Sequence, residues 1–109
     1  MTYDGTYYAH VVDVPAPAGV YDATHTELLR RTGGHVDGLI MHVCRATEGG
    51  FQVLEVWTDR AACERADREL VAPILAKQAK AVSDAPFIPP RVEEFAVRGL
   101  VIPAAGIAT

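Results

Sequence analysis

Two apolar stretches flank a pair of adjacent glycines in the segment Gly38–Arg60. Runs of alternating character around a Gly-Gly pair predict a β-hairpin, because the tightest hairpin turns need positive φ angles at both central residues. If Gly49 and Gly50 form the whole loop, one face of the hairpin mixes polar and apolar side chains: His42, Cys44, Glu55 and Trp57, beside Ile40, Ala46, Phe51 and Val53. The other face is almost purely aliphatic: Leu39, Met41, Val43, Leu54 and Val56.

The residues on either side of the hairpin predict two further strands, one before it and one after it, and two helices. Aromatic and β-branched residues indicate a first strand at Tyr7–Val14, followed by a helix at Gly19–Thr32 that ends at a Gly-Gly pair. After the hairpin strands, Leu39–Thr47 and Phe51–Thr58, the last strand is expected at Arg91–Ile102, with residues 104–109 as a loose tail.

The second helix is expected to begin after a cap at Thr58 or Asp59 and to run to about Val82. Pro73 should kink it after Leu70, since proline removes a helical N–H. Its inner face is an apolar stripe at helical spacing: Ala62, Ala66, Leu70 and Ile74.

The order β-α-β-β-α-β predicts an α+β, ferredoxin-like fold in which residues 1–109 form a single domain. Two helices cover one face of its antiparallel sheet, yet the hairpin is apolar on both faces. A second copy of the chain is the economical cover, so we expect a homodimer through the open sheet face.

Composition excludes several classes of protein. A net charge of −4 and a pI near 5.4 argue against a nucleic-acid partner. The N-terminus lacks the pattern of a signal peptide and no apolar run has membrane-spanning length, so a cytoplasmic protein without a membrane partner is expected. Cys44 and Cys63 are expected to be reduced thiols.

The element order, the short hairpin and the segment VLEVWTDRAACERA resemble the dimeric α+β barrel proteins, and are most similar to the antibiotic-biosynthesis-monooxygenase-like group. This resemblance covers roughly Tyr7–Pro103 and implies an enzyme of small aromatic or polyketide-like molecules, with Trp57 as the residue that carries over. Asp67 stands where haem-degrading members carry an iron-ligating histidine, and the chain contains no asparagine. Haem degradation is therefore disfavoured, and no cofactor is expected.

Glu55 and His42 are the candidate catalytic residues. In the assumed register His42 lies opposite Trp57, and Cys44 opposite Glu55. A carboxylate in an apolar strand is costly unless it is paired, and a Glu–His pair can orient a general base. The alternative is a structural pair without catalytic function.

Four further side chains are candidates for substrate binding: Trp57, Tyr21, His10 and His25. Aromatic and imidazole rings suit a planar ligand, although an indole can equally be a core anchor. The histidines show no metal-ligand spacing, so no metal site is expected.

The leading hypothesis is a cofactor-independent monooxygenase-like enzyme that removes a proton from a small hydrophobic or aromatic ligand. One alternative is a non-catalytic ligand-binding or structural dimer, in which the polar cluster is packed and closed. Another is an oxygen-independent polyketide cyclase or isomerase. Catalysis predicts that His42 and Glu55 reach an open cavity with Trp57 at its wall.

Overall fold

The structure is a computed structural model that describes residues 7–79 and 88–109. Its elements follow one another along the chain as β1 (Tyr8–Val14), α1 (Ala18–Thr32), β2 (Leu39–Thr47), β3 (Gly50–Trp57), α2 (Arg60–Ala66), a π-helical segment (Asp67–Val71), α3 (Ala72–Ala79), β4 (Arg91–Ala96), β5 (Val101–Ile102), a 3-10 turn (Pro103–Ala105) and β6 (Ile107–Ala108).

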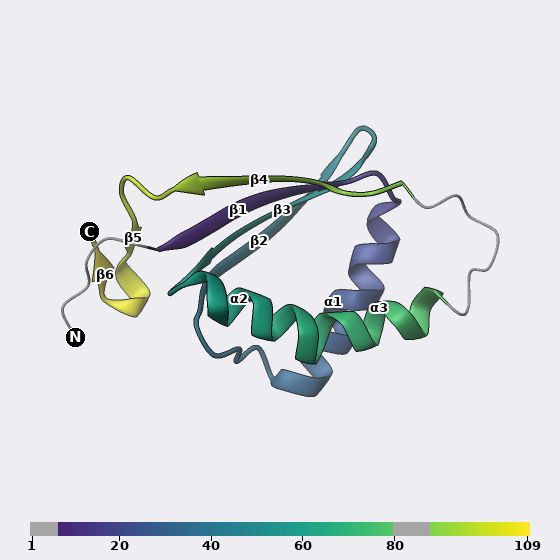
Figure 1. The fold of residues 1–109 in the computed structure, drawn as a ribbon, viewed down its shortest axis with the longest axis horizontal. Coiled ribbons are helices and arrows are strands. Elements are labelled where there is room, and N and C mark those ends of the chain that lie inside the picture. The colour runs from purple at the N-terminus through teal and green to yellow at the C-terminus, as the bar shows by residue number, and fades with distance from the viewer. Residues whose placement is uncertain (1–6, 80–87) are drawn as a thin grey trace.

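The main sheet is antiparallel, with the strand order β2-β3-β1-β4. The helices α1, α2 and α3 all lie on one side of it (Figure 1). This arrangement confirms the predicted ferredoxin-like α+β fold, in which each half contributes strands that alternate in the sheet. The opposite side of the sheet carries no helix of the described residues.

The hairpin loop differs from the predicted one. Thr47 pairs with Gly50, so the loop is Glu48-Gly49, and neither glycine of the pair has a positive φ. Gly50 belongs to the strand, and the end of β1 and the residues after it pass close to it: a Cβ atom there would lie 2.0 Å from the carbonyl oxygen of Val14 and 2.9 Å from the backbone nitrogen of Ala16. The glycine is therefore needed for close approach of two backbones rather than for turn geometry.

The loop lies one residue earlier than predicted, which shifts the register of the two strands by two residues. His42 lies opposite Glu55 and Cys44 opposite Val53, so the predicted His42–Trp57 and Cys44–Glu55 pairs are wrong. A shift of two residues leaves every side chain on its predicted face, because side chains alternate with period two. The histidine, the glutamate and the indole therefore still share one face.

The start of β2 departs from this alternation. The register slips between Leu39 and Met41, so Leu39 packs with Trp57 while Ile40 joins the opposite face. Both predicted face assignments are therefore wrong for Leu39 and Ile40. Just before the bulge, Gly38 has a φ of +83°, and a Cβ atom there would lie 2.5 Å from that of Ala62. This close contact seats α2 against the strand.

The second helical stretch begins as predicted. The Asp59 side chain accepts a hydrogen bond from the backbone N–H of Ala62 at 2.8 Å, as an N-cap does. Of the predicted inner stripe, Ala62, Ala66 and Ile74 are buried, and Leu70 is partly buried.

At the predicted kink, the helical path continues through the wider π turn of Asp67–Val71 into α3. This turn comes just before Pro73. Proline has no backbone N–H, so it cannot donate the helical hydrogen bond to the carbonyl group one turn earlier, and the regular α-helical pattern is interrupted there. The expected end near Val82 lies outside the described residues.

The C-terminal region differs from the single long strand expected. β4 ends at Ala96, and β5 and β6 form a separate small hairpin in place of the loose tail. Leu100 packs on Ala9 and Val56, so this hairpin covers one end of the sheet face that carries no helix. Among the described residues, no helix combines the length and apolar character needed to cross a membrane.

Candidate active site

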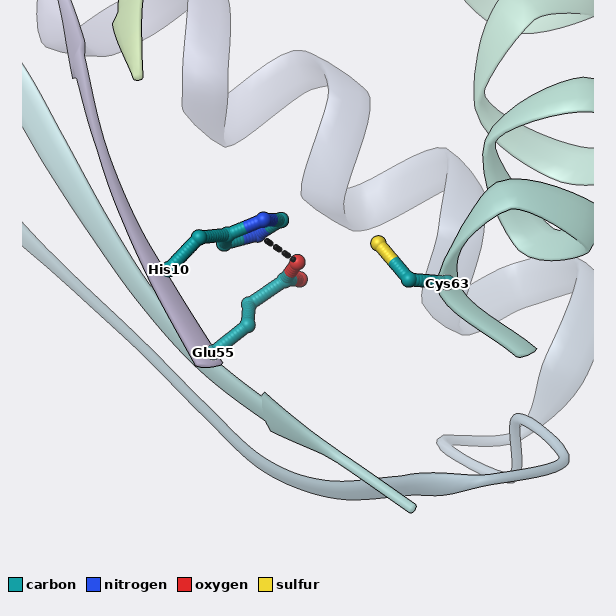
Figure 2. Close-up of side chains that lie close together, drawn as sticks. All are labelled: His10, Glu55 and Cys63. Atoms are coloured by element: carbon teal, nitrogen blue, oxygen red, sulfur yellow. Dashed lines mark hydrogen bonds and ion pairs between the residues drawn. The ribbon is translucent and has the colours of Figure 1, made fainter. Parts of the chain in front are cut away.

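The Glu55 side chain is the centre of a hydrogen-bond network between the sheet and the helices. Its carboxylate meets His10 Nε2 at 2.8 Å and His42 Nδ1 at 2.7 Å, and accepts the indole N–H of Trp57 at 3.2 Å. Figure 2 shows His10 and Glu55 reaching from adjacent strands toward each other and toward α2. The carboxylate that is costly in an apolar strand is thus satisfied by three N–H groups.

These partners fix the charge of Glu55. Burial raises its pKa, but hydrogen bonds from His10, His42 and Trp57 outweigh burial and lower the pKa to about 2. The carboxylate is ionised at neutral pH and can only accept hydrogen bonds. His10 Nε2 and His42 Nδ1 are therefore the protonated, donating nitrogens.

The hydrogen bonds continue from His42 to α1. In the neutral ring of His42 the lone pair is on Nε2, which accepts the Tyr21 hydroxyl at 2.6 Å. Since that hydroxyl has one proton, the contact of 3.2 Å to His25 Nδ1 has His25 as the donor. These contacts form one continuous line of hydrogen bonds from His25 through Tyr21 and His42 to Glu55.

The three rings of this line lie almost parallel. Their interplanar angles are 16° for Tyr21–His25, 11° for Tyr21–His42 and 5° for His25–His42, and the ring centroids are 5.2 to 5.9 Å apart. Burial raises the pKa of Tyr21 to about 12, with Cys44 and Glu55 adding to it, so its hydroxyl keeps its proton at neutral pH. Tyr21 is thus placed as a hydrogen-bond donor to His42.

All six sequence-predicted site residues lie in or beside this network. His42 and Glu55 are in direct contact, and Tyr21, His25 and His10 surround them. Trp57 is only 3% exposed and packs with Ala62, Cys63 and Ala66, so its ring also anchors α2 to the sheet. Its role in substrate binding stays a prediction.

Sequence reasoning did not assign a site role to three other residues beside the network. The Tyr8 hydroxyl lies 3.3 Å from His10 Nδ1, and the spacing of two residues along one strand is the signal that places both on one face. Cys63 Sγ lies 3.9 Å from Asp67 Oδ2, and their spacing of four residues is the helical signal.

The network reaches solvent through His42, whose side chain is 24% exposed, whereas Glu55 is 16% exposed. Two surface hollows of the described residues lie elsewhere. One, of about 360 Å³, is next to Arg65, and the other, of about 270 Å³, is next to Phe51 and Arg91. Neither is lined by His42 or Glu55, so the open cavity expected for catalysis is not at these two hollows.

The chain matches no protein-family model and no curated protein sequence. Similarity is found among solved structures, at low sequence identity.

A protein of unknown function from Nitrosomonas europaea superposes with a TM-score of 0.61 and 19% identity, over 91% of this chain and 96% of that one. A candidate antibiotic biosynthesis monooxygenase from Caulobacter crescentus CB15 gives a TM-score of 0.59 and 14% identity, over 87% and 92% of the two chains. SnoaB, a cofactor-independent oxygenase from Streptomyces nogalater, gives 0.51 and 18%, over 85% and 92%. The expected resemblance is thus confirmed for the fold: this chain has the fold of antibiotic-biosynthesis-monooxygenase-like proteins.

Proposed function

We propose that this protein is a cofactor-independent monooxygenase-like enzyme that removes a proton from a planar aromatic or polyketide-like molecule. The observation that carries the proposal is the line of hydrogen bonds from Tyr21 through His42 to an ionised Glu55. A histidine held in one tautomer by a carboxylate is the usual arrangement of an oriented general base. The fold shared with SnoaB is consistent with this chemistry, but fold alone does not assign it.

In this proposal Nε2 of His42 is the base. The substrate takes the place of the Tyr21 hydroxyl at Nε2, and its acidic C–H proton moves to that nitrogen. Glu55 keeps Nδ1 protonated and stabilises the imidazolium that forms, which makes it a positioning residue. The displaced hydroxyl of Tyr21 then donates to the enolate oxygen of the substrate.

Oxygen is the second reactant. For an anthrone, one atom of O₂ becomes the new carbonyl oxygen on the reacting carbon. The other atom leaves as water with the two hydrogens of that carbon, so no further reductant is needed. In this proposal His42 forms the carbanion by taking a proton from the substrate, and the Tyr21 hydroxyl stabilises the resulting enolate.

The substrate is expected to lie along the aromatic rings near Tyr21 and His25. These rings present parallel faces to a planar ligand. His10 and Trp57 lie deeper, on the far side of Glu55, and define the end of the site. Neither of the two described hollows is at this position, so in this proposal the substrate enters from the solvent-exposed side of His42.

We further propose a homodimer through the face of the sheet that carries no helix. Its central row joins Val43, Leu54 and Val11 across three strands, and Val43 is 51% exposed. Phe95, 41% exposed, extends the apolar area on β4. An antiparallel sheet open to water would carry polar residues in such a row, so a second copy of the chain is the expected cover.

A non-catalytic ligand-binding or structural dimer is the second candidate. It is favoured by the burial of Trp57 and by the positions of the two hollows away from His42. An oxygen-independent cyclase or isomerase would use the same base without oxygen.

Oxygen uptake with a model anthrone in metal-free buffer tests the proposal. We expect protein-dependent uptake that falls about 100-fold in His42→Ala, the size expected for a lost general base, and falls also in Trp57→Phe. His35→Ala is the matched control, since His35 is exposed and pairs only locally with Asp37. Product formation without oxygen uptake would indicate the cyclase or isomerase. No turnover above the spontaneous rate would reject the enzyme and favour the binding dimer.

A further inference from the structure

A cluster of metal-ligating side chains lies on the α2 side of Glu55, opposite His42. One ligand atom each of His10, Glu55 and Cys63 lies within 4.8 Å of the others. They come from β1, β3 and α2, three elements that meet at the buried end of the site (Figure 2). No local spacing in the sequence links positions 10, 55 and 63, so the cluster exists only in the folded chain.

A fourth donor is next to the cluster. The Asp67 carboxylate lies 3.9 Å from Cys63 Sγ, one helical turn further along the chain. The four side chains offer one imidazole nitrogen, one thiol sulfur and two carboxylates. This set suits zinc and similar transition metals, which bind nitrogen and sulfur ligands, rather than magnesium or calcium.

Burial and charge favour a cation at this point. Cys63 is 3% exposed, and the side chains of His10 and Glu55 are 9% and 16% exposed. Burial, together with the negative charges of Asp67 and Glu55, raises the pKa of the Cys63 thiol to about 12. Several acidic groups thus share a space that a divalent ion would neutralise.

We propose that His10, Glu55 and Cys63 bind a thiophilic divalent transition metal such as Zn²⁺, with Asp67 as the fourth ligand. Ligand atoms around a tetrahedral zinc ion are about 3.5 Å apart. Cys63 Sγ would therefore move inward, whereas His10 Nε2 and Glu55 Oε1, which are 2.8 Å apart in their hydrogen bond, would separate to admit the ion between them. The Cys63 proton leaves to solvent, and the His10 proton moves from Nε2 to Nδ1, from which it is donated in a hydrogen bond to the Tyr8 hydroxyl oxygen at 3.3 Å.

The ion would tie α2 to β1 and β3 as a structural metal. It uses Oε1 of Glu55, and Oε2 remains bonded to His42, so the metal does not require the catalytic proposal to hold. A metal test therefore needs no substrate and no turnover, and its outcome is independent of the oxygen-uptake assay.

Titration of the metal-free full chain with Co²⁺ tests the site, because cobalt replaces zinc and a cobalt–thiolate bond gives a charge-transfer band in the near ultraviolet. We expect one Co²⁺ per chain, displacement of cobalt by Zn²⁺, and a rise in Tm with either metal. The band should disappear in Cys63→Ser. It should persist in Cys44→Ser, the matched control, because Cys44 is the other free cysteine and lies outside the cluster.

Binding measured by calorimetry gives a second readout that does not depend on the sulfur. His10→Gln should weaken Zn²⁺ binding at least tenfold, and circular dichroism of the metal-free variants shows whether each is folded. Saturable binding that is lost in His10→Gln and in Cys63→Ser supports the site. No saturable cobalt band in the wild type, or a band lost in Cys44→Ser and kept in Cys63→Ser, overturns it.

Discussion

The two faces of the sheet are both rich in apolar side chains, but the surroundings of their central residues differ. Under the helices, Glu55 is held by three N–H groups from within the chain. On the opposite face, Val43 and Leu54 form an apolar row with no helix above it. The polar centre of one face is therefore satisfied within a single chain, whereas the other face leaves its apolar row uncovered, which is the basis of the proposed dimer. This difference separates substitutions that act on folding from substitutions that act on assembly.

The largest expected effect is the loss of the central carboxylate. Glu55→Leu leaves two histidines and the Trp57 indole without their acceptor, and breaking a buried pair of this kind costs about 3–5 kcal/mol. The measurement is the free energy of unfolding from urea denaturation. Glu93→Leu is the control, since Glu93 is an exposed strand glutamate on the other face. Because Glu93 pairs with Val11 of the apolar row, both variants are compared in the monomeric Val43→Lys background. Equal losses for the two variants would remove the distinction between the faces.

The sequence allowed much of this architecture to be predicted, because the signals are local. Alternation places His42 and Glu55 on one face, and the sequence predicts a helix cap at Thr58 or Asp59, of which the structure has Asp59. The hairpin register could not be predicted, since Gly50 is needed for contact with Val14, a residue far away in the chain. Local signals do not report such long-range approaches of the backbone.

The same limit applies to the site. The line from Tyr21 to His42 depends on how α1 lies on the sheet, and the group around Cys63 depends on how α2 does. The C-terminal hairpin was missed because the apolar residues of Val101–Ile102 and Ile107–Ala108 are too few to give a periodic pattern.

A charge in the centre of the open face should act on assembly. Val43→Lys places an ammonium group in the apolar row. We expect about 100-fold weaker self-association, because a residue at the centre of an interface contributes strongly to binding and the charge would have to be buried there. Light scattering should give about twice 11.7 kDa for the wild type and about 11.7 kDa for the variant at micromolar concentration.

Val20→Lys is the matched control for this experiment, because Val20 is an exposed valine, 44% accessible, on α1. It should leave the mass unchanged. A wild type that is monomeric at micromolar concentration would remove the argument that the open face is covered by a second copy.

On the helix face, the hydroxyl of Tyr21 should contribute a smaller amount. Tyr21→Phe removes the hydrogen bond to His42 and is expected to cost about 1 kcal/mol of unfolding free energy. A double-mutant cycle with His42→Ala should give a coupling energy of similar size. A parallel cycle with His35→Ala should give none, since His35 is bonded to Asp37 instead. Coupling absent from both cycles would mean that the line of hydrogen bonds ends at His42.

The smallest effect is expected at the polar edge of the open face. Arg45 donates to Gln52 at 2.9 Å, and Gln52 donates to Asp13 at 2.9 Å, so the row beyond Val43 is polar and satisfied within the chain. In a monomer these exposed bonds contribute little, and Arg45→Ala should change the free energy of unfolding by less than about 0.5 kcal/mol. The monomeric background for this measurement is Val43→Lys.

In the wild type the result depends on where the interface ends. If the partner copy stops at the apolar row, Arg45→Ala should have the same small effect on unfolding and none on the dimer dissociation constant, which sedimentation can measure. If the partner extends over Arg45, the lost side chain lies in a drier environment and the dimer should dissociate at higher concentration. We expect the first result, because a polar row that satisfies itself across three strands has the character of an interface rim, not of its centre. The comparison of Arg45→Ala in the two backgrounds therefore locates the edge of the proposed dimer interface.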